Sequence, residues 1–250
     1  MRAALFAVGL ALLVAVELGA PTRDPFGNSA ATAGAAATNP CERATEEQKT
    51  TLTRPADLLL LEMPDRAIWQ RPDDIMDKLN IADSAWVADV GAGSGWFTIR
   101  LSQRVDPQKR GRGKVFAQDV QQEMLTAIDR RVRREGFRNV VTIRGDDEST
   151  RLPRHVLDAI LVVDVYSEIA AEKRIAFLRD LADSLKPAGR IGIVNYKPGA
   201  GGPGPECRFP RSVVERDARA ADLQLFPTVD LLYQYVVVLG KEPSKARAVS

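Results

Sequence analysis

Short apolar runs alternate with longer amphipathic segments from Trp69 onward. The runs are rich in Val, Ile and Leu, which is typical of β-strands, whereas the segments between them repeat apolar residues every three or four positions, as helices do. Strands that alternate with helices are typical of an α/β domain with a parallel sheet. We therefore expect strands at 86–90, 114–117, 140–144, 157–163 and 190–195.

Turn and capping residues bound the helices expected between these strands. Pro72 opens one helix, Ser94 is placed to cap the next, and Pro107 stops it. Further helices are expected from 121 to Gly136, around 175–185 before the 187–189 turn, and at 212–221. The runs 223–226 and 233–239 follow, and their short connection predicts an antiparallel hairpin. The run 157–163 is almost continuously apolar, so we expect it at the centre of the sheet.

The N-terminus has the pattern of a targeting segment. Arg2 precedes an apolar run from Ala3 to Val16, which Glu17 ends. This is the pattern of a secretory signal, and a retained anchor is the alternative, although the run is shorter than the about 20 residues of a bilayer-spanning helix. We predict that residues 1–20 are a signal peptide or membrane anchor. The protein is then exported to the periplasm or cell envelope, or tethered to the membrane; it is cytoplasmic if the segment does not function.

Composition divides the rest of the chain. Residues 21–55 are rich in Ala, Thr, Pro and Gly and are expected to form a disordered linker. Residues 56–242 are expected to form the folded domain, and 243–250 a disordered tail. Cys41 and Cys207 would pair in an oxidising compartment, and two unpaired thiols are an equally good interpretation. A single histidine, His155, argues against histidine-based metal sites, so we predict no metal.

Charge indicates no particular partner. The formal net charge is +2, too small for a dedicated nucleic-acid binder, so no nucleic acid is expected as a partner. Two basic groups, at 109–114 and 130–134, are interpreted as solvated surface, since cations near helix ends complement the helix dipole. The alternative is contact with an anionic partner.

A glycine-rich turn follows the first expected strand. Gly91, Gly93 and Gly95 remove side chains there, so the backbone can approach a ligand, and the next helix presents its N-terminus to negative charge. The dinucleotide fingerprint has a further glycine where this chain has Trp96, which argues against a pyrophosphate site. The alternative is a tight strand-to-helix connection with no ligand.

Acidic residues follow the next two expected strands. Asp119 lies at the carboxyl edge of the sheet, where ligands of open α/β folds bind, and is suited to accept both hydroxyls of a ribose. Its alternative role is a helix N-cap. Asp146 and Asp147 lie at the same edge, and one of them is a candidate to accept a hydrogen bond from an adenine amino group. The alternative there is a solvated acidic loop.

Four ordered motifs resemble those of the class I S-adenosylmethionine-dependent methyltransferases. They are VADVGAGSGWFT, KVFAQDVQQEML, LDAILVVDVYSEI and LKPAGRIGIVNYKP. The resemblance implies a Rossmann-like, seven-stranded, mostly parallel sheet with helices on both faces and a C-terminal antiparallel hairpin. It implies S-adenosylmethionine as cofactor, with Asp89, Gly91, Gly93 and Gly95 around its methionine end. By the same resemblance Asp119 binds the ribose, and Asp146 or Asp147 lies near the adenine.

The sequence is most similar to a bacterial, signal-bearing subgroup of that family. The segments that carry this likeness are RAIWQRP at 66–72 and VVDVYSE at 162–168. Ser167 stands where the subgroup usually has histidine, which leaves open whether an activity that needs the histidine is retained.

Methyl transfer from a sulfonium needs mainly alignment and exclusion of water. Tyr166 and Glu168 follow the fourth expected strand, and we predict that they contact the substrate as the catalytic pair. The acceptor is an unidentified small molecule or protein, and no oligomeric state is predicted. One alternative is a noncatalytic S-adenosylmethionine-binding or scaffold module in the cell envelope. The other, a nicotinamide oxidoreductase, is disfavoured by Trp96.

Overall fold

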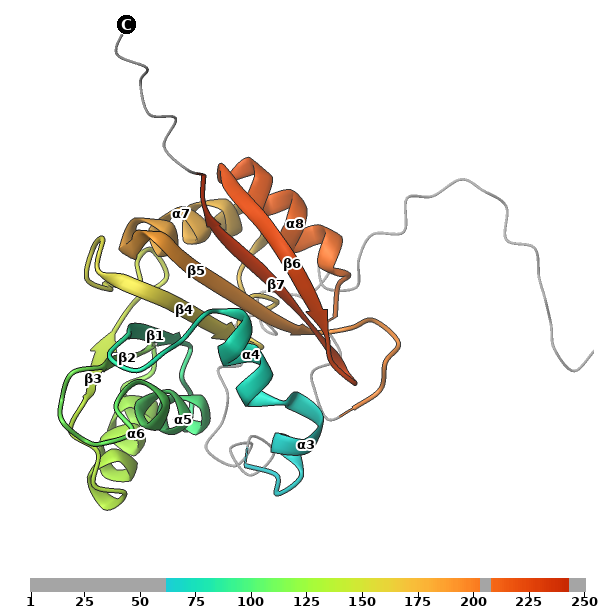
Figure 1. The fold of residues 1–250 in the computed structure, drawn as a ribbon. Helices are drawn as coiled ribbons and strands as arrows, with labels where there is room; N and C mark the ends of the chain where they lie inside the picture. The colour runs from blue at the N-terminus through green and yellow to red at the C-terminus, as the bar shows by residue number, and fades with distance from the viewer. Residues whose placement is uncertain (1–61, 203–207, 243–250) are drawn as a thin grey trace, which may run out of the picture. The chain divides into compact units, whose positions relative to one another are not determined.

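The computed structural model describes residues 62–202 and 208–242, which belong to one compact unit of the chain, Thr38–Ser250 (Figure 1). The predictions for the N-terminal segment, for Cys41 and Cys207, and for the C-terminal tail lie outside these residues. Within the two described ranges, the structure has no helix that is both long enough and apolar enough to cross a membrane.

A seven-stranded sheet forms the centre of this unit, in the order β3-β2-β1-β4-β5-β7-β6. β1 to β5 pair in parallel, whereas β7 is antiparallel to both β5 and β6. This confirms the predicted Rossmann-like sheet with its antiparallel C-terminal hairpin. The strands are β1 Trp86–Val90, β2 Lys114–Asp119, β3 Val140–Arg144, β4 Leu157–Val163, β5 Leu185–Tyr196, β6 Leu223–Asp230 and β7 Gln234–Lys241.

Helices cover both faces of the sheet, as Figure 1 shows. The apolar residues of α7 and α8 pack on one face, and those of α4 and α5 pack on the other. α6 joins the second group through contacts with α5 and β2. The helices are α3 Arg66–Gln70, α4 Pro72–Lys78, α5 Trp96–Val105, α6 Gln122–Arg134, α7 Arg174–Ser184 and α8 Arg211–Ala220, with a 3-10 turn at Ala171–Lys173.

β4 is the middle strand, as its continuous apolar run predicts. Five of its seven residues are buried, because neighbouring strands lie on both sides and helices cover both faces. The carboxyl ends of β1, β2 and β4 therefore meet at one edge of the sheet.

Several predicted boundaries were wrong. β2 and β6 extend to Asp119 and Asp230, beyond the predicted ends at 117 and 226. Ser94 does not cap α5: the helix begins at Trp96, and its N-cap is Gly95, in the left-handed conformation with φ 81°. Leu185 begins β5 instead of ending α7. Leu157 pairs with Leu185 and Ala159 with Arg190, so the expected turn at 187–189 is an irregularity inside the strand. Leu185 is buried in either conformation, so apolar periodicity could not distinguish helix from strand.

Candidate functional site

The glycine turn lies against the loop that follows β4. Gly91 has φ 67°, and a Cβ atom added to it would lie 2.2 Å from Cγ2 of Val165. Gly93 and Gly95 also have positive φ, with values of 53° and 81°. The turn after β1 therefore needs glycine both for its backbone conformation and for its close packing.

Asp119 ties the end of β2 to this turn. One carboxylate oxygen accepts a hydrogen bond from the backbone N–H of Gly93 at 2.9 Å, and the other accepts from the N–H of Gln121 at 2.9 Å. Burial raises the pKa of the carboxyl group, and the hydrogen bonds oppose that rise. The N-cap of α6 is Gln121, so Asp119 orders the start of the helix without being its cap.

Asp89 is buried at the same edge of the sheet. Its carboxylate accepts a hydrogen bond from the Thr98 hydroxyl at 2.6 Å, which joins β1 to α5. Burial raises its pKa to about 6, although that hydrogen bond and the positive charge of Arg66 oppose the rise.

Gln118 is a site residue that the sequence analysis missed. Its side-chain oxygen accepts from the backbone N–H of Gly91 at 3.4 Å, and a Cβ atom at Gly145 would lie 2.2 Å from its side-chain nitrogen. Gln118 thus links the turns after β1 and β3. Its position beside Asp119, at the end of a buried strand, was the feature of the sequence from which this role could have been predicted.

Asp146 and Asp147 belong to the loop after β3. Asp146 accepts hydrogen bonds from the N–H groups of Glu148 and Ser149, and its other oxygen accepts from Arg151 at 2.6 Å. These contacts lower its pKa. The side chain of Asp147 is exposed. These are the contacts of a solvated acidic loop, and the adenine contact stays a prediction.

The structure separates Tyr166 from Glu168. Tyr166 is fully buried on the α7–α8 face, where its hydroxyl donates to Asp217 at 3.1 Å and its ring contacts Phe209. Glu168 is exposed as a residue, but the protein around its carboxyl group raises its pKa to about 7, and the negative charge of Asp119 adds to the rise. Glu168 is therefore at the ligand edge, and Tyr166 is in the core.

Asp164 begins the loop after β4 in a left-handed conformation, with φ 61°. Its N–H donates to the carbonyl of Val194, and its carboxylate accepts from the side-chain amide of Gln234 at 2.7 Å. Burial raises its pKa to about 7, whereas the positive charge of Arg66 lowers it.

A chain of buried side chains connects Asp164 to α3. The amide of Gln234 accepts from Gln70 at 2.9 Å, and Gln70 in turn accepts from Arg66 at 2.6 Å. The guanidinium of Arg66 lies 4.4 Å from the centre of the Trp96 ring. α3 is thus fixed over the start of α5, beside the glycine turn.

Trp69 packs the other side of α3. Its ring centre is 6.1 Å from that of Tyr196 and 5.7 Å from that of Tyr233, and it is almost completely buried. These contacts pack Trp69 against aromatic side chains of β5 and of the turn before β7.

The residues at this edge fit an adenosine cofactor that carries positive charge. The glycine turn leaves room for close backbone approach, and each oxygen of Asp119 keeps acceptor capacity beyond its one backbone N–H. The hydroxyl of Ser94, in the same turn, is buried and has no hydrogen-bond partner within the described residues. The carboxyl groups of Asp89, Asp119 and Asp164 provide the negative charge that a sulfonium and an ammonium group need nearby.

Comparison with known proteins gives the same fold. Residues 87–189 match a family model described as a methyltransferase domain. A crystal structure of a SAM-dependent methyltransferase from Aquifex aeolicus superposes with a TM-score of 0.67 at 25% identity, covering 75% of this chain and 98% of that one. Magnesium protoporphyrin IX methyltransferase from Synechocystis, solved with bound SAM, superposes with a TM-score of 0.55 at 14% identity, over 73% and 84% of the two chains.

A curated relative matches over a shorter stretch. Demethylmenaquinone methyltransferase from Anoxybacillus flavithermus is 24% identical over 49% of this chain, and the chain spans 48% of that protein's length. The likeness to a signal-bearing bacterial subgroup stays a prediction. Residues 87–189 are thus a methyltransferase domain, and the sheet around them has the fold of the class I S-adenosylmethionine-dependent methyltransferases, whose cofactor is S-adenosylmethionine.

Proposed function

We propose that the chain transfers a methyl group from S-adenosylmethionine to a small-molecule or protein acceptor. The observation that carries the proposal is the junction at the carboxyl edge of the sheet, where the N–H of Gly93 donates to the carboxylate of Asp119. This contact aligns a glycine-rich turn with a buried carboxylate, an arrangement suited to a nucleoside. The matched methyltransferase domain and the fold support the same activity.

Different residues around the junction would bind different parts of the cofactor. Asp119 would accept hydrogen bonds from the ribose hydroxyls, while Gly91, Gly93, Gly95 and Asp89 would shape the methionine end. The cofactor, when bound, supplies an electrophilic methyl group on a sulfonium. The main contribution of the protein is then to align the acceptor and exclude water, since the displacement has a good leaving group.

Glu168 is the residue that we assign to the acceptor. Its pKa of about 7 leaves the carboxylate partly ionised at neutral pH, so it is suited to accept a proton from an acceptor hydroxyl or ammonium group. Tyr166 receives a structural role in this proposal, because its hydroxyl is buried against Asp217.

The first experiment is a calorimetric titration of the purified protein with S-adenosylmethionine and S-adenosylhomocysteine, with NAD as control. We expect micromolar binding of the first two and none of NAD, since Trp96 replaces the glycine of a dinucleotide site. Transfer of a labelled methyl group to a panel of acceptors follows. Preference for NAD would overturn the assignment, whereas cofactor binding without transfer across a broad panel would favour the noncatalytic module.

The place of the protein in the cell is a separate proposal. We infer from residues 1–20 that the chain is exported to the periplasm or cell envelope or anchored in a membrane, with 21–55 as a linker. Cell fractionation with N-terminal sequencing tests this. A cytosolic protein with an intact Met1 would contradict it.

A further inference from the structure

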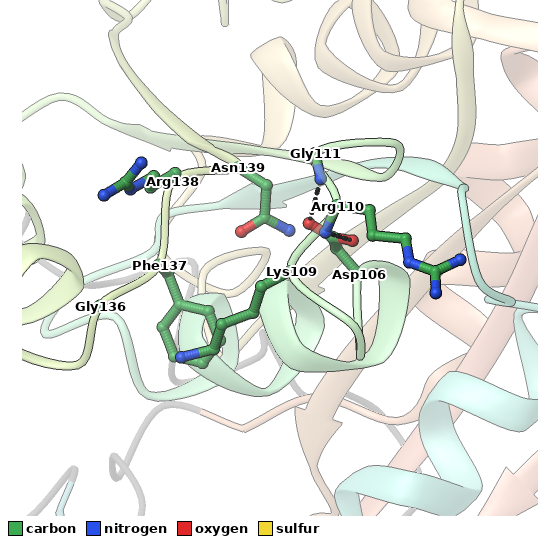
Figure 2. Close-up of a pocket in the computed structure, with 8 residues that line it drawn as sticks. All are labelled: Asp106, Lys109, Arg110, Gly111, Gly136, Phe137, Arg138 and Asn139. Carbon is green, nitrogen blue, oxygen red and sulfur yellow. Dashed lines mark hydrogen bonds between the residues drawn. The ribbon is translucent and has the colours of Figure 1, made fainter.

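A hollow lies at the end of the sheet away from the cofactor site. It has a volume of about 440 Å³ and is lined by the loops that precede β2 and β3 (Figure 2). Gly91, in contrast, follows the end of β1, and Asp119 is the last residue of β2, so both lie at the opposite end of the sheet. Since each strand residue rises by about 3.3 Å, six-residue β2 separates the two ends by roughly 20 Å.

Three exposed cations line this hollow, and two more precede one of its loops in the chain. Lys109, Arg110 and Arg138 line it, and Arg133 and Arg134 lie in the last turn of α6, directly before the loop that lines it. We call these five residues the basic face.

The carboxylates near the basic face neutralise only part of its charge. Asp106 is almost completely buried and accepts from the N–H groups of Arg110 and Gly111, at 2.8 and 2.7 Å. Glu135 lies 3.1 Å from Arg131 and 3.8 Å from Arg134. The basic face therefore keeps net positive charge.

The cations do not converge on one point. Figure 2 shows Arg110 and Arg138 extending toward opposite sides of the hollow, while Lys109 extends toward Phe137. The Lys109 ammonium lies 4.8 Å from the centre of the Phe137 ring. Spaced charges fit an extended anionic surface better than a single small anion.

The position of the basic face excludes a direct role in methyl transfer, because an acceptor must reach the opposite edge of the sheet. A role in positioning the protein is compatible with this location. The sequence contains a further signal of the same kind, the apolar run of residues 3–16. A hydrophobic segment and a cluster of cations both favour attachment to an anionic membrane, since binding strength combines buried apolar area with electrostatic attraction to anionic lipids.

We propose that the basic face docks on an anionic phospholipid surface, with the cofactor edge of the sheet turned toward the aqueous side. The apolar N-terminal segment, while it is retained, raises the local concentration of the basic face at that surface. The inference does not depend on catalysis.

The test is sedimentation of the full chain with phosphatidylcholine vesicles and with vesicles that also contain phosphatidylglycerol. The variant carries Arg133→Glu, Arg134→Glu and Arg138→Glu. The matched control carries Lys78→Glu, Arg211→Glu and Arg219→Glu, which make the same change in net charge at exposed positions on α4 and α8. Thermal unfolding and S-adenosylhomocysteine binding check that both variants are folded.

We expect the wild type and the control to bind the anionic vesicles more than the neutral ones and to lose this excess binding at high salt. The excess binding of the variant should be at least about tenfold smaller. A second variant with glutamine at the same three positions should lose binding to a smaller extent. Equal partitioning of wild type and variant would overturn the proposal. So would salt-sensitive binding to duplex DNA or RNA that depends on these arginines while vesicle binding does not.

Discussion

Gly91 and Val165 meet where the turn after β1 touches the loop after β4. Replacing Gly91 by alanine would add a methyl group 2.2 Å from the Val165 side chain, on a backbone with φ 67°. Gly111→Ala is a matched control, because Gly111 has φ 72° and nothing within 4 Å of an added Cβ. We expect both changes to cost about 1 kcal/mol for backbone strain, and Gly91→Ala to cost more and to weaken cofactor binding. Urea unfolding and calorimetry measure the difference, and equal effects of the two changes would contradict the close packing.

Asp119 has two functions that one substitution removes together. It orders the glycine turn through the N–H of Gly93, and we assign it to the ribose. Asp119→Ala should weaken S-adenosylmethionine binding at least about tenfold, because charge-assisted hydrogen bonds are among the strong ones. Calorimetry of the folded variant measures this. Unchanged affinity would remove Asp119 from the site.

A substitution of Tyr166 distinguishes a structural role of this residue from a role in the cofactor site. Tyr166→Phe removes the hydrogen bond to buried Asp217, which keeps its contact with Arg216. We expect a loss of about 1–2 kcal/mol in the free energy of unfolding and no change in cofactor affinity. Urea unfolding and calorimetry separate the two effects, and weakened cofactor binding without a loss of stability would return Tyr166 to the site.

At the scale of elements, the position of α3 depends on β7. Gln234 donates to Asp164 and accepts from Gln70, so a single buried side chain joins α3, β7 and the loop after β4. The five-residue helix has too few backbone hydrogen bonds to hold itself in place. We infer that this chain of side chains and the packing of Trp69 fix α3 beside the glycine turn.

Gln234→Met tests this connection by keeping the length of the side chain and removing its polar atoms. The change removes the hydrogen bonds that Gln234 makes with Asp164 and Gln70. We expect the free energy of unfolding to fall by about 2–3 kcal/mol. Amide hydrogen exchange in α3 should become faster. Gln224→Met, at an exposed position on neighbouring β6, is the control. Unchanged exchange in α3 would show that packing alone holds the helix.

At the scale of the whole molecule, buried carboxyl groups make stability depend on pH. The pKa values of Asp89 and Asp164 are raised by burial to about 6 and about 7, above the roughly 3.9 of an unfolded aspartate. Between these values the folded chain binds more protons than the unfolded chain. The free energy of unfolding therefore falls as pH rises from about 4 to about 7.

Asp164→Asn removes one of these titrations while keeping an oxygen that can accept from Gln234. The free energy of unfolding of the variant should fall less than that of the wild type between pH 5 and pH 8, as urea unfolding at the two pH values would show. If the free energy of unfolding changed equally with pH in the wild type and the variant, Asp164 would have the same pKa in the folded and unfolded states.

Local pattern was sufficient for much of the fold. β1, β3 and β4 begin and end at the predicted residues, because apolar runs bounded by polar residues mark buried strands. The glycine turn and Asp119 were also predictable, since the carboxyl ends of adjacent parallel strands meet at one edge of the sheet. Their direct hydrogen bond is a consequence of that arrangement.

The sequence by itself thus determined the order of strands and helices and the edge at which the cofactor site lies. Only the tertiary structure decided which side chains of the loop after β4 face that edge. The chain turns after β4, with Asp164 in a left-handed conformation and the N–H of Glu168 donating to the carbonyl of Val165, so strand alternation does not continue there. Tyr166 is buried in the core as a result, whereas Glu168 is exposed. Gln70 and Gln234 meet across 164 residues of sequence. Local periodicity reports whether a residue is buried, whereas its partner depends on contacts between distant segments.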